Sequence, residues 1–152
     1  MKGTLSVDVS LTGTRTPLSR SAIADIARET LRREGVRSAL LSITLVDRRT
    51  IARLNRRHLG HAGATDVISF AFERATRRDP VIGDIYIAPD VARANARSRG
   101  VGVRNELARL VVHGVLHVLG YDHPEGERRE RSPMWRRQER LLHAAEHRTS
   151  GR

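Results

Sequence analysis

Polar and hydrophobic residues alternate strictly along residues 4–10, which predicts a β-strand with one buried face. Residues 39–46 are rich in leucine and isoleucine and predict a second strand. Two further short apolar stretches, over residues 65–72 and 81–88, predict the third and fourth strands. Four short strands of this kind are enough for one small sheet.

Helical spacing of apolar residues predicts about five helices between and after these strands. The first is expected to open at Thr16-Pro17, because proline is favoured at the first helical position, and to close at Gly35. Asp47 and Ser132 are expected to cap the second and the last helix. The other four predicted helices cover residues 48–58, 89–100, about 104–119 and 133 onward, and the charged run over 125–131 is expected to be a solvated loop or a frayed turn.

Strands and helices in this order predict an α+β fold, with a single small mixed sheet of about four strands and about five helices packed on it. The chain has 152 residues, no internal repeat and no linker long enough to separate two domains. We therefore expect a single domain over residues 1–147, followed by a disordered tail over residues 148–152.

Two histidines lie four residues apart on the predicted helix over residues 104–119, so His113 and His117 share one helix face. Gly120 can end this helix and let the chain turn back, which brings His123 to the open side of the pair. Three imidazoles that leave the fourth position to water are the ligand set of a catalytic zinc site. The pattern predicts a site of the zinc-hydrolase kind on a central buried helix.

The alternative interpretation makes these three residues core histidines that are satisfied by hydrogen bonds. It is disfavoured because residues 107–119 are apolar almost all round, and burying two adjacent histidines there is costly unless something binds them. His143 and His147 have the same spacing but no third partner, and are interpreted as polar residues on a solvated last turn. His58 and His61 precede a glycine-containing loop and stay ambiguous.

The composition limits which metal ligands and which binding partners are available to this chain. The chain has no cysteine, so only nitrogen and oxygen ligands are available for a metal. Its net charge of +11 is carried almost entirely by arginine, whose planar fork matches phosphate, and this favours a polyanionic partner over a merely solvated basic surface. The N-terminus has no apolar signal region and no long uncharged run follows, so we expect a cytoplasmic protein with no membrane partner.

Three sequence blocks resemble those of the YbeY family of bacterial rRNA maturation factors, which are zinc-dependent, single-strand-specific endoribonucleases. The blocks are Leu54-Asn55 with Gly60 and Thr65-Asp66-Val67-Ile68-Ser69-Phe70, then Ile82-Gly83-Asp84-Ile85, and then Glu106-Leu107 with His113-Gly114 and Gly120-Tyr121-Asp122-His123. In order and spacing they span roughly residues 40 to 142.

The resemblance implies one Zn2+ per chain, held by His113, His117 and His123. It also implies hydrolysis of RNA phosphodiester bonds in maturation of the 3′ end of 16S rRNA and in ribosome quality control. The expected partners are single-stranded RNA and the small ribosomal subunit, and no DNA is expected. One position departs from the family pattern, since Leu59 stands where many relatives carry an arginine.

Three nearby residues, Arg56, Arg57 and His61, are the candidates for substrate binding in place of that arginine, although the two arginines also fit a solvated helix surface. The catalytic groups stay unassigned beyond a water molecule at the zinc. The nucleophile is either that water or the 2′-hydroxyl of the RNA, and no general base is identified. Gly114 follows the first histidine where His-Glu-x-x-His metalloproteases carry glutamate, which disfavours peptide hydrolysis and suggests close packing of a neighbouring element instead.

Two other functions stay open at this point. One is a zinc hydrolase of another small substrate. The other is a non-catalytic RNA-binding ribosome assembly factor with a structural zinc, which requires a fourth protein ligand from among His58, His61 and Asp122. Asp122 is interpreted mainly as a turn residue that bonds the local backbone, and Asp84, in an apolar strand, is expected to need a partner.

Overall fold

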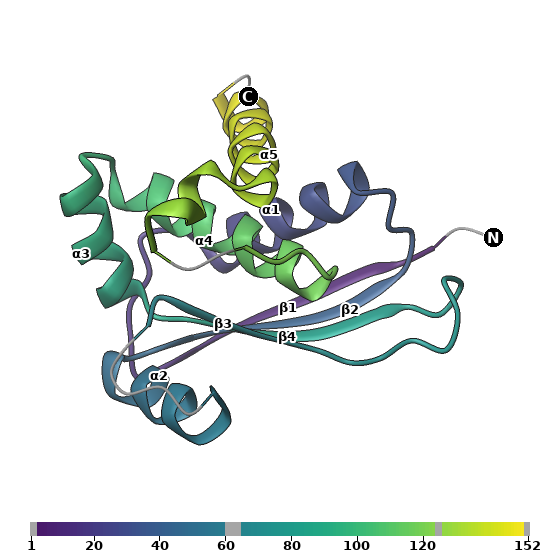
Figure 1. Ribbon diagram of the computed structural model, residues 1–152, viewed down its shortest axis with the longest axis horizontal. Coiled ribbons are helices and arrows are strands. Elements are labelled where there is room, and N and C mark those ends of the chain that lie inside the picture. Colours follow the sequence, from purple (N-terminus) through teal and green to yellow (C-terminus); the bar gives the residue numbers. More distant parts are fainter. Residues whose placement is uncertain (1–2, 60–64, 124–125, 151–152) are drawn as a thin grey trace.

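The computed structural model describes residues 3–59, 65–123 and 126–150. In these ranges the chain forms one four-stranded sheet in the order β1-β2-β4-β3 (Figure 1). The strands are β1 (Leu5–Thr12), β2 (Ala39–Val46), β3 (Val67–Ala71) and β4 (Val81–Ile87). β1, β2 and β4 run parallel to one another, and β3 pairs antiparallel with β4, so the predicted mixed sheet is confirmed.

Five α-helices accompany the sheet in the described ranges, as expected. They are α1 (Arg20–Arg33), α2 (Arg48–Leu54), α3 (Pro89–Arg99), α4 (Val103–Val118) and α5 (Pro133–Ser150). A short π-helix, η1 (Asn55–Leu59), continues α2, and a 3-10 helix, η2 (Gly126–Arg131), precedes α5 in place of the expected loop or frayed turn. Figure 1 shows α1, α3, α4 and α5 on one side of the sheet and α2 on the other.

The first helix begins at Arg20, not at Thr16-Pro17 as expected from the sequence. The Thr16 hydroxyl accepts a hydrogen bond from Leu18 N–H (3.2 Å) and donates one to Leu18 O (2.9 Å), which holds this segment in a turn. Ser19 then caps the helix by accepting from Ala22 N–H at 3.0 Å. The predicted caps Asp47 and Ser132 are confirmed by their bonds to the N–H groups of Thr50 and Trp135.

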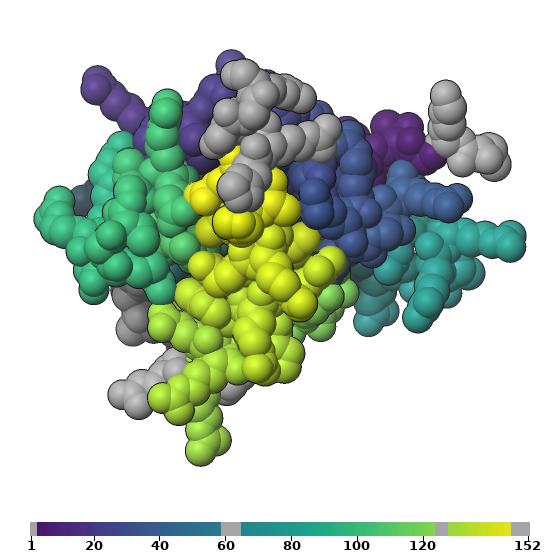
Figure 2. Space-filling view, turned by 90° about the horizontal axis from the view of Figure 1, so that it is seen from above, coloured from purple at the N-terminus to yellow at the C-terminus, as the bar shows by residue number. Residues whose placement is uncertain are grey.

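The core lies between the sheet and the helix layer. Alternate strand residues, among them Val7, Ile43 and Ile85, pack against α1 and α4. α5 lies over the outer side of α4, and Val112, Leu116, Met134 and Leu141 form an apolar contact between the two helices. Figure 2 shows α5 (yellow) across the middle of this outer surface, with α1 (blue) on one side. α4 is therefore enclosed from both sides.

The opposite face of the sheet is only partly covered. α2 packs at one end of it, where Ile51 joins Val46 and Ile68 in a small cluster. Asp84 points to this half-open face and is partly exposed, with no ion pair or hydrogen bond among the described residues. The expectation that Asp84 needs a partner stays a prediction, although water reaches this face and can solvate the carboxylate. None of the described helices is long and apolar enough to cross a membrane.

α5 extends through Ser150, so its backbone includes three of the five residues expected in a tail. The assignment of a single domain to residues 1–147 and of a disordered tail to residues 148–152 stays a prediction.

The contact between α4 and the sheet depends on glycine. A Cβ atom added at Gly114 would lie 2.8 Å from Ile85 Cγ2 and 3.4 Å from Ser69 Oγ, which agrees with the predicted role of this glycine in close packing. Ser69 Oγ also donates a hydrogen bond to Gly114 O at 3.2 Å. The helix that carries the histidines is thus held directly on β3 and β4.

We expect Gly114→Ala to lower the free energy of unfolding by about 1–3 kcal/mol, because overpacking against the buried Ile85 outweighs the higher helix propensity of alanine. Urea denaturation of the single variants Gly114→Ala and Ile85→Ala and of the double variant would measure the coupling between the two positions. A favourable coupling of about 1 kcal/mol or more is expected, since truncation of Ile85 removes the clash. Simple additivity would contradict the close-packing role.

Candidate metal centre

Short-range geometry places the three histidines. His113 and His117 project from one face of α4, and the helix ends in a Schellman motif, in which Gly120 N–H donates to His117 O and Tyr121 N–H to Leu116 O, both at 3.0 Å. Gly120 has φ of +101°, a conformation that favours glycine. The reversal brings His123 back toward the helix.

Two contacts hold the turn that carries His123. Asp122 Oδ1 accepts a hydrogen bond from His123 N–H at 2.8 Å, so the predicted turn role of Asp122 is confirmed. The Tyr121 hydroxyl donates to the carboxylate of Glu34, which follows α1. Glu34 is itself paired with Arg137 on α5 at 2.7 Å. The turn is therefore anchored to both neighbouring helices.

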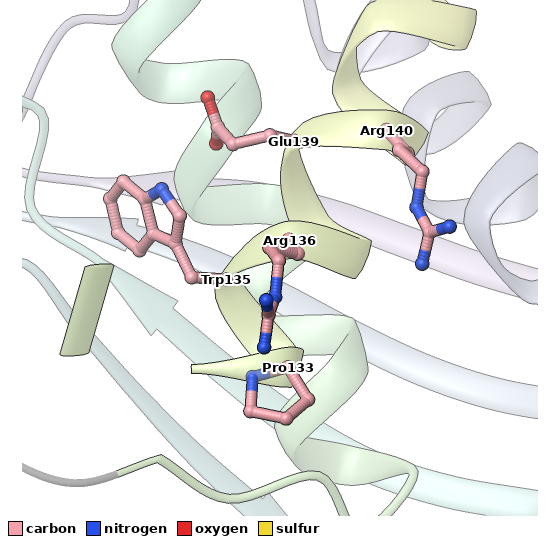
Figure 3. Close-up of a pocket in the computed structure, with 5 residues that line it drawn as sticks. All are labelled: Pro133, Trp135, Arg136, Glu139 and Arg140. Atoms are coloured by element: carbon pink, nitrogen blue, oxygen red, sulfur yellow. The ribbon is translucent and has the colours of Figure 1, made fainter. Parts of the chain in front are cut away.

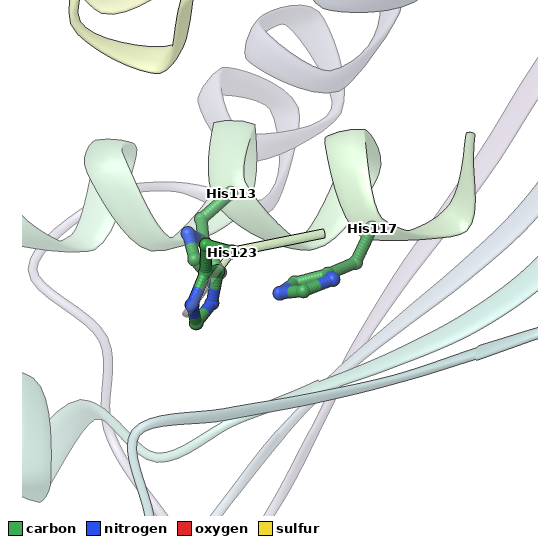
Figure 4. A group of neighbouring side chains, drawn as sticks. All are labelled: His113, His117 and His123. Atoms are coloured by element: carbon green, nitrogen blue, oxygen red, sulfur yellow. The ribbon is translucent and has the colours of Figure 1, made fainter. Parts of the chain in front are cut away.

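The three imidazoles converge as the spacing predicted. Their ring centroids lie 4.6 Å (His113 to His117), 5.0 Å (His113 to His123) and 4.9 Å (His117 to His123) apart. One ligand nitrogen from each ring lies within 4.8 Å of the other two. Figure 4 shows the rings gathered on the side of α4 that faces the sheet. Because zinc bonds imidazole nitrogen at about 2.0–2.1 Å, one ion can contact all three after small ring rotations.

His113 has a buried partner on α5. Its Nδ1 lies 2.6 Å from Oε1 of Gln138, a residue that is 0% exposed. The amide nitrogen of Gln138 is committed to Glu139 Oε2 at 3.1 Å, so its oxygen faces the ring. His113 Nδ1 therefore carries the hydrogen, and the lone pair of Nε2 is left for a metal.

An ion-pair network in turn holds Glu139. Arg109 Nε and Nη2 donate to its two carboxylate oxygens at 2.9 and 3.0 Å, and Arg109 Nη1 donates to Glu106 at 2.8 Å. Both Glu106 and Arg109 are buried. Burial opposes the charge of Arg109, but the carboxylates of Glu139 and Glu106 outweigh it and raise the pKa of Arg109. The network therefore stays charged and gives Gln138 a fixed orientation.

Burial also keeps His113 and His117 neutral. Desolvation, with the positive charges of His117 and Arg129 acting in the same direction, lowers the pKa of His113 to about 3. Desolvation and the charge of His123 lower the pKa of His117, although a hydrogen bond with the backbone of Tyr121 opposes the shift. Neutral imidazoles are what a metal requires, so the donor set fits zinc at neutral pH.

The proposed fourth ligands do not join the cluster within the described ranges. The metal-binding group found there contains only His113, His117 and His123. The ring of His58 packs edge-on against Phe70 at 5.2 Å, and Asp122 bonds the backbone. His61 lies outside the described residues. The described chain thus supplies three protein ligands and leaves a coordination position for water or substrate.

Arg56 and Arg57 are exposed on η1, and their role in substrate binding stays a prediction, as does that of His61. His143, from the second histidine pair, is exposed on α5 and lies outside the cluster. A hollow of about 550 Å3 on the surface of α5, lined by residues such as Trp135, Arg136 and Arg140, is not lined by any of the three histidines (Figure 3).

Sequence reasoning missed Gln138 and its ion-pair network. A signal was present, because Gln138 follows Met134 by four residues and precedes Leu141 and Leu142, so it is a polar residue on the apolar face of the last helix. Its contact with His113 spans 25 residues, which no local pattern reveals.

Comparisons with known proteins agree on one family. A family model described as "Endoribonuclease YbeY" matches residues 11–146. The chain is 39% identical to Endoribonuclease YbeY of Nocardioides sp. over 84% of its length and 90% of that protein. It is 38% identical to the protein of the same name from Pelotomaculum thermopropionicum over 93% of its length and 91% of the relative.

Two other matches are more limited. The chain is 40% identical to Endoribonuclease YbeY of Frankia alni over 68% of its own length, and this match spans only 62% of that longer protein. The solution structure of TM1509 from Thermotoga maritima has a similar fold, with a TM-score of 0.62 at 23% identity over 95% of this chain and 93% of the other.

We expect Gln138→Leu to weaken zinc binding about 10- to 100-fold, because His113 loses the acceptor that fixes its tautomer and orientation. Competition with a chromophoric chelator would measure the affinity. Arg140→Leu, on the exposed side of the same helix, is the matched control and should change affinity by less than about twofold. An equal loss in both variants would count against the positioning role of Gln138.

The low pKa of His113 also predicts a pH dependence of stability in the metal-free protein. Since its pKa falls from 6.5 in the unfolded chain to about 3 in the folded protein, the unfolded state binds more protons below pH 6.5. The free energy of unfolding should therefore decrease by about 2 kcal/mol between pH 7 and pH 5 from this residue alone. Urea denaturation at both pH values, with chelator present, measures it. His113→Gln should show a correspondingly smaller decrease, and identical pH dependences would refute the expectation.

Proposed function

The chain belongs to the YbeY endoribonuclease family, and from this premise we propose that it is a zinc-dependent enzyme that hydrolyses phosphodiester bonds of single-stranded RNA. Its proposed task is maturation of the 3′ end of 16S rRNA and ribosome quality control in the cytoplasm, with the small ribosomal subunit as partner. The observation that carries the proposal is the convergence of three imidazoles, with no fourth protein ligand among the described residues, so that one coordination position is left to water or substrate.

Zinc is the cofactor that this donor set favours. The ligands are nitrogen atoms only, and the chain has no cysteine that could bind the metal instead. When bound by three neutral imidazoles, zinc would lower the pKa of a water molecule and stabilise negative charge on a phosphoryl oxygen. Both effects suit phosphodiester hydrolysis, in which negative charge develops on the non-bridging oxygens.

Other residues of the chain set the orientation and the protonation state of the histidines. Gln138 keeps the hydrogen of His113 at Nδ1, so that Nε2 is directed to the metal. The apolar surroundings of α4 keep His113 and His117 deprotonated. The basic composition, with a net charge of +11, favours attraction of a polyanionic strand, and the affinity is expected to fall with salt.

The alternatives have less support. A structural zinc requires a fourth protein ligand, and the described residues offer none at the cluster. A peptidase of the His-Glu-x-x-His kind requires glutamate at the position of Gly114, where even a methyl group would meet Ile85. An RNA cleavage assay distinguishes the proposed nuclease from an assembly factor that binds RNA without cleaving it.

Incubation with a single-stranded oligoribonucleotide tests the proposal. We expect cleavage by the wild-type protein, and a loss of at least about 100-fold in His117→Ala or after chelator treatment, because the metal loses a ligand or is removed. His143→Ala is the matched control, since it removes a histidine of the same i,i+4 spacing outside the cluster, and should cleave like wild type. Activity that persists in His117→Ala and with chelator would indicate a contaminating nuclease and reject the proposal.

A further inference from the structure

A polar cavity of about 600 Å3 lies where the segment before β3, helix α3 and η2 meet. Its lining includes Thr65, Ser98, Arg99 and Arg129. This cavity has no role in the metal centre described above, because none of the three histidines lines it.

The acidic groups of the cavity already have partners. Glu130 pairs with Arg99 at 2.6 Å, and Asp66 accepts a hydrogen bond from the side chain of Asn95 at 3.0 Å. Arg99 also pairs with the buried Glu106 at 3.2 Å, and its guanidinium lies 4.9 Å from the Trp135 ring centroid. Two carboxylates therefore compensate the charge of Arg99, which is held in place by the network that reaches Gln138.

Arg129 differs from Arg99 in the groups around it. No carboxylate within the described ranges forms an ion pair with it, and its Nε is buried without a hydrogen-bond acceptor. The guanidinium lies 5.9 Å from the Trp135 ring centroid, a contact that orients the planar group but satisfies none of its N–H donors. Arg129 therefore lines the cavity without an anionic partner among the described residues.

The same residue lies close to the metal centre. Arg129 lies over Trp135 on α5, and Gln138, three residues further along the same helix, contacts His113 at 2.6 Å. Arg99, the other arginine of the cavity, pairs with Glu106 on α4, the helix that carries His113 and His117. Side-chain contacts thus link the cavity to both helices of the histidine cluster.

We propose that this cavity is a subsite for the backbone of the RNA strand, in which Arg129 binds a phosphate next to the scissile one. The inference rests on the proposed nuclease function and adds a substrate-binding residue to it. A planar guanidinium matches two phosphate oxygens, and the hydroxyls of Thr65 and Ser98 can donate to the same phosphate or to the ribose. Recognition of the backbone alone makes this contact independent of base sequence.

The binding experiment uses the full chain with His117→Ala, so that the RNA is not cleaved. A labelled single-stranded oligoribonucleotide of roughly ten nucleotides is titrated over a range of salt concentrations by fluorescence anisotropy. With Arg129→Gln we expect about tenfold weaker binding and a salt slope smaller by about 0.7, the contribution of one phosphate contact. Arg128→Gln is the matched control, because it removes the same charge from the exposed neighbouring position, and should change affinity by less than about twofold.

Arg129→Lys tests whether a loss of RNA affinity in Arg129→Gln arises only from a disturbed structure. It keeps the charge and removes the planar fork, so the salt slope should stay near that of the parent while affinity falls only in part. Equal binding by Arg129→Gln and Arg128→Gln would overturn the subsite, and so would a lysine variant that loses the slope as completely as glutamine does. Thermal denaturation of each variant verifies folding.

Cleavage by the same variants with His117 intact separates the two proposals. If the wild type cleaves RNA while Arg129→Gln binds and cleaves like Arg128→Gln, the subsite is wrong and the nuclease function stands. If the wild type does not cleave but Arg129→Gln still weakens binding and reduces the salt slope, the subsite is supported and the nuclease function fails.

Discussion

Burial of α4 is the constraint on which the rest of this structure depends. The helix lies between the sheet and α5, and its buried residues include Glu106, Arg109 and His113. Polar groups removed from water need partners at fixed positions. α5 supplies these partners, since Gln138 accepts from His113 and Glu139 accepts from Arg109. The last helix therefore completes the core and at the same time sets the protonation and direction of a metal ligand.

The same burial decides the chemistry of the cluster and has a cost in stability. Apolar surroundings disfavour protonated imidazole, which leaves the nitrogen lone pairs of His113 and His117 available at neutral pH. His113 and His117 without a metal are unfavourable for folding in acid, because the unfolded chain can bind protons that the folded chain excludes. A bound cation would offset this cost, so metal binding would be coupled to folding stability through the same side chains.

The arginines that dominate the composition have different physical roles. Arg28 and Arg93 form exposed pairs with carboxylates three residues away, and such pairs contribute little to stability. Arg109 lies buried between two carboxylates and holds the partner of a metal ligand in place. Arg129 stacks on Trp135 with a buried donor unsatisfied. A net charge of +11 indicates an affinity for anions, but only these surroundings distinguish a structural arginine from one available to substrate.

The sequence by itself determined the features that depend on short-range geometry. Within the described ranges, the four strands follow from apolar residues at every second position and the five helices from apolar residues three or four positions apart. The convergence of His113, His117 and His123 follows from a four-residue spacing on one helix and a turn at Gly120, so all of these features were predictable. The start of the first helix was not predictable. Proline favours the first helical position, but the hydrogen bonds of the Thr16 hydroxyl hold the segment around Pro17 in a turn, and Ser19 caps the helix instead. Only the tertiary structure decided that Gln138 meets His113, that Asp84 is partly exposed, and that Arg129 lies over Trp135. Gln138 and His113 are distant in the chain and meet only because α5 packs on α4. The exposure of Asp84 depends on how much of the sheet face α2 covers, which no local sequence pattern reveals.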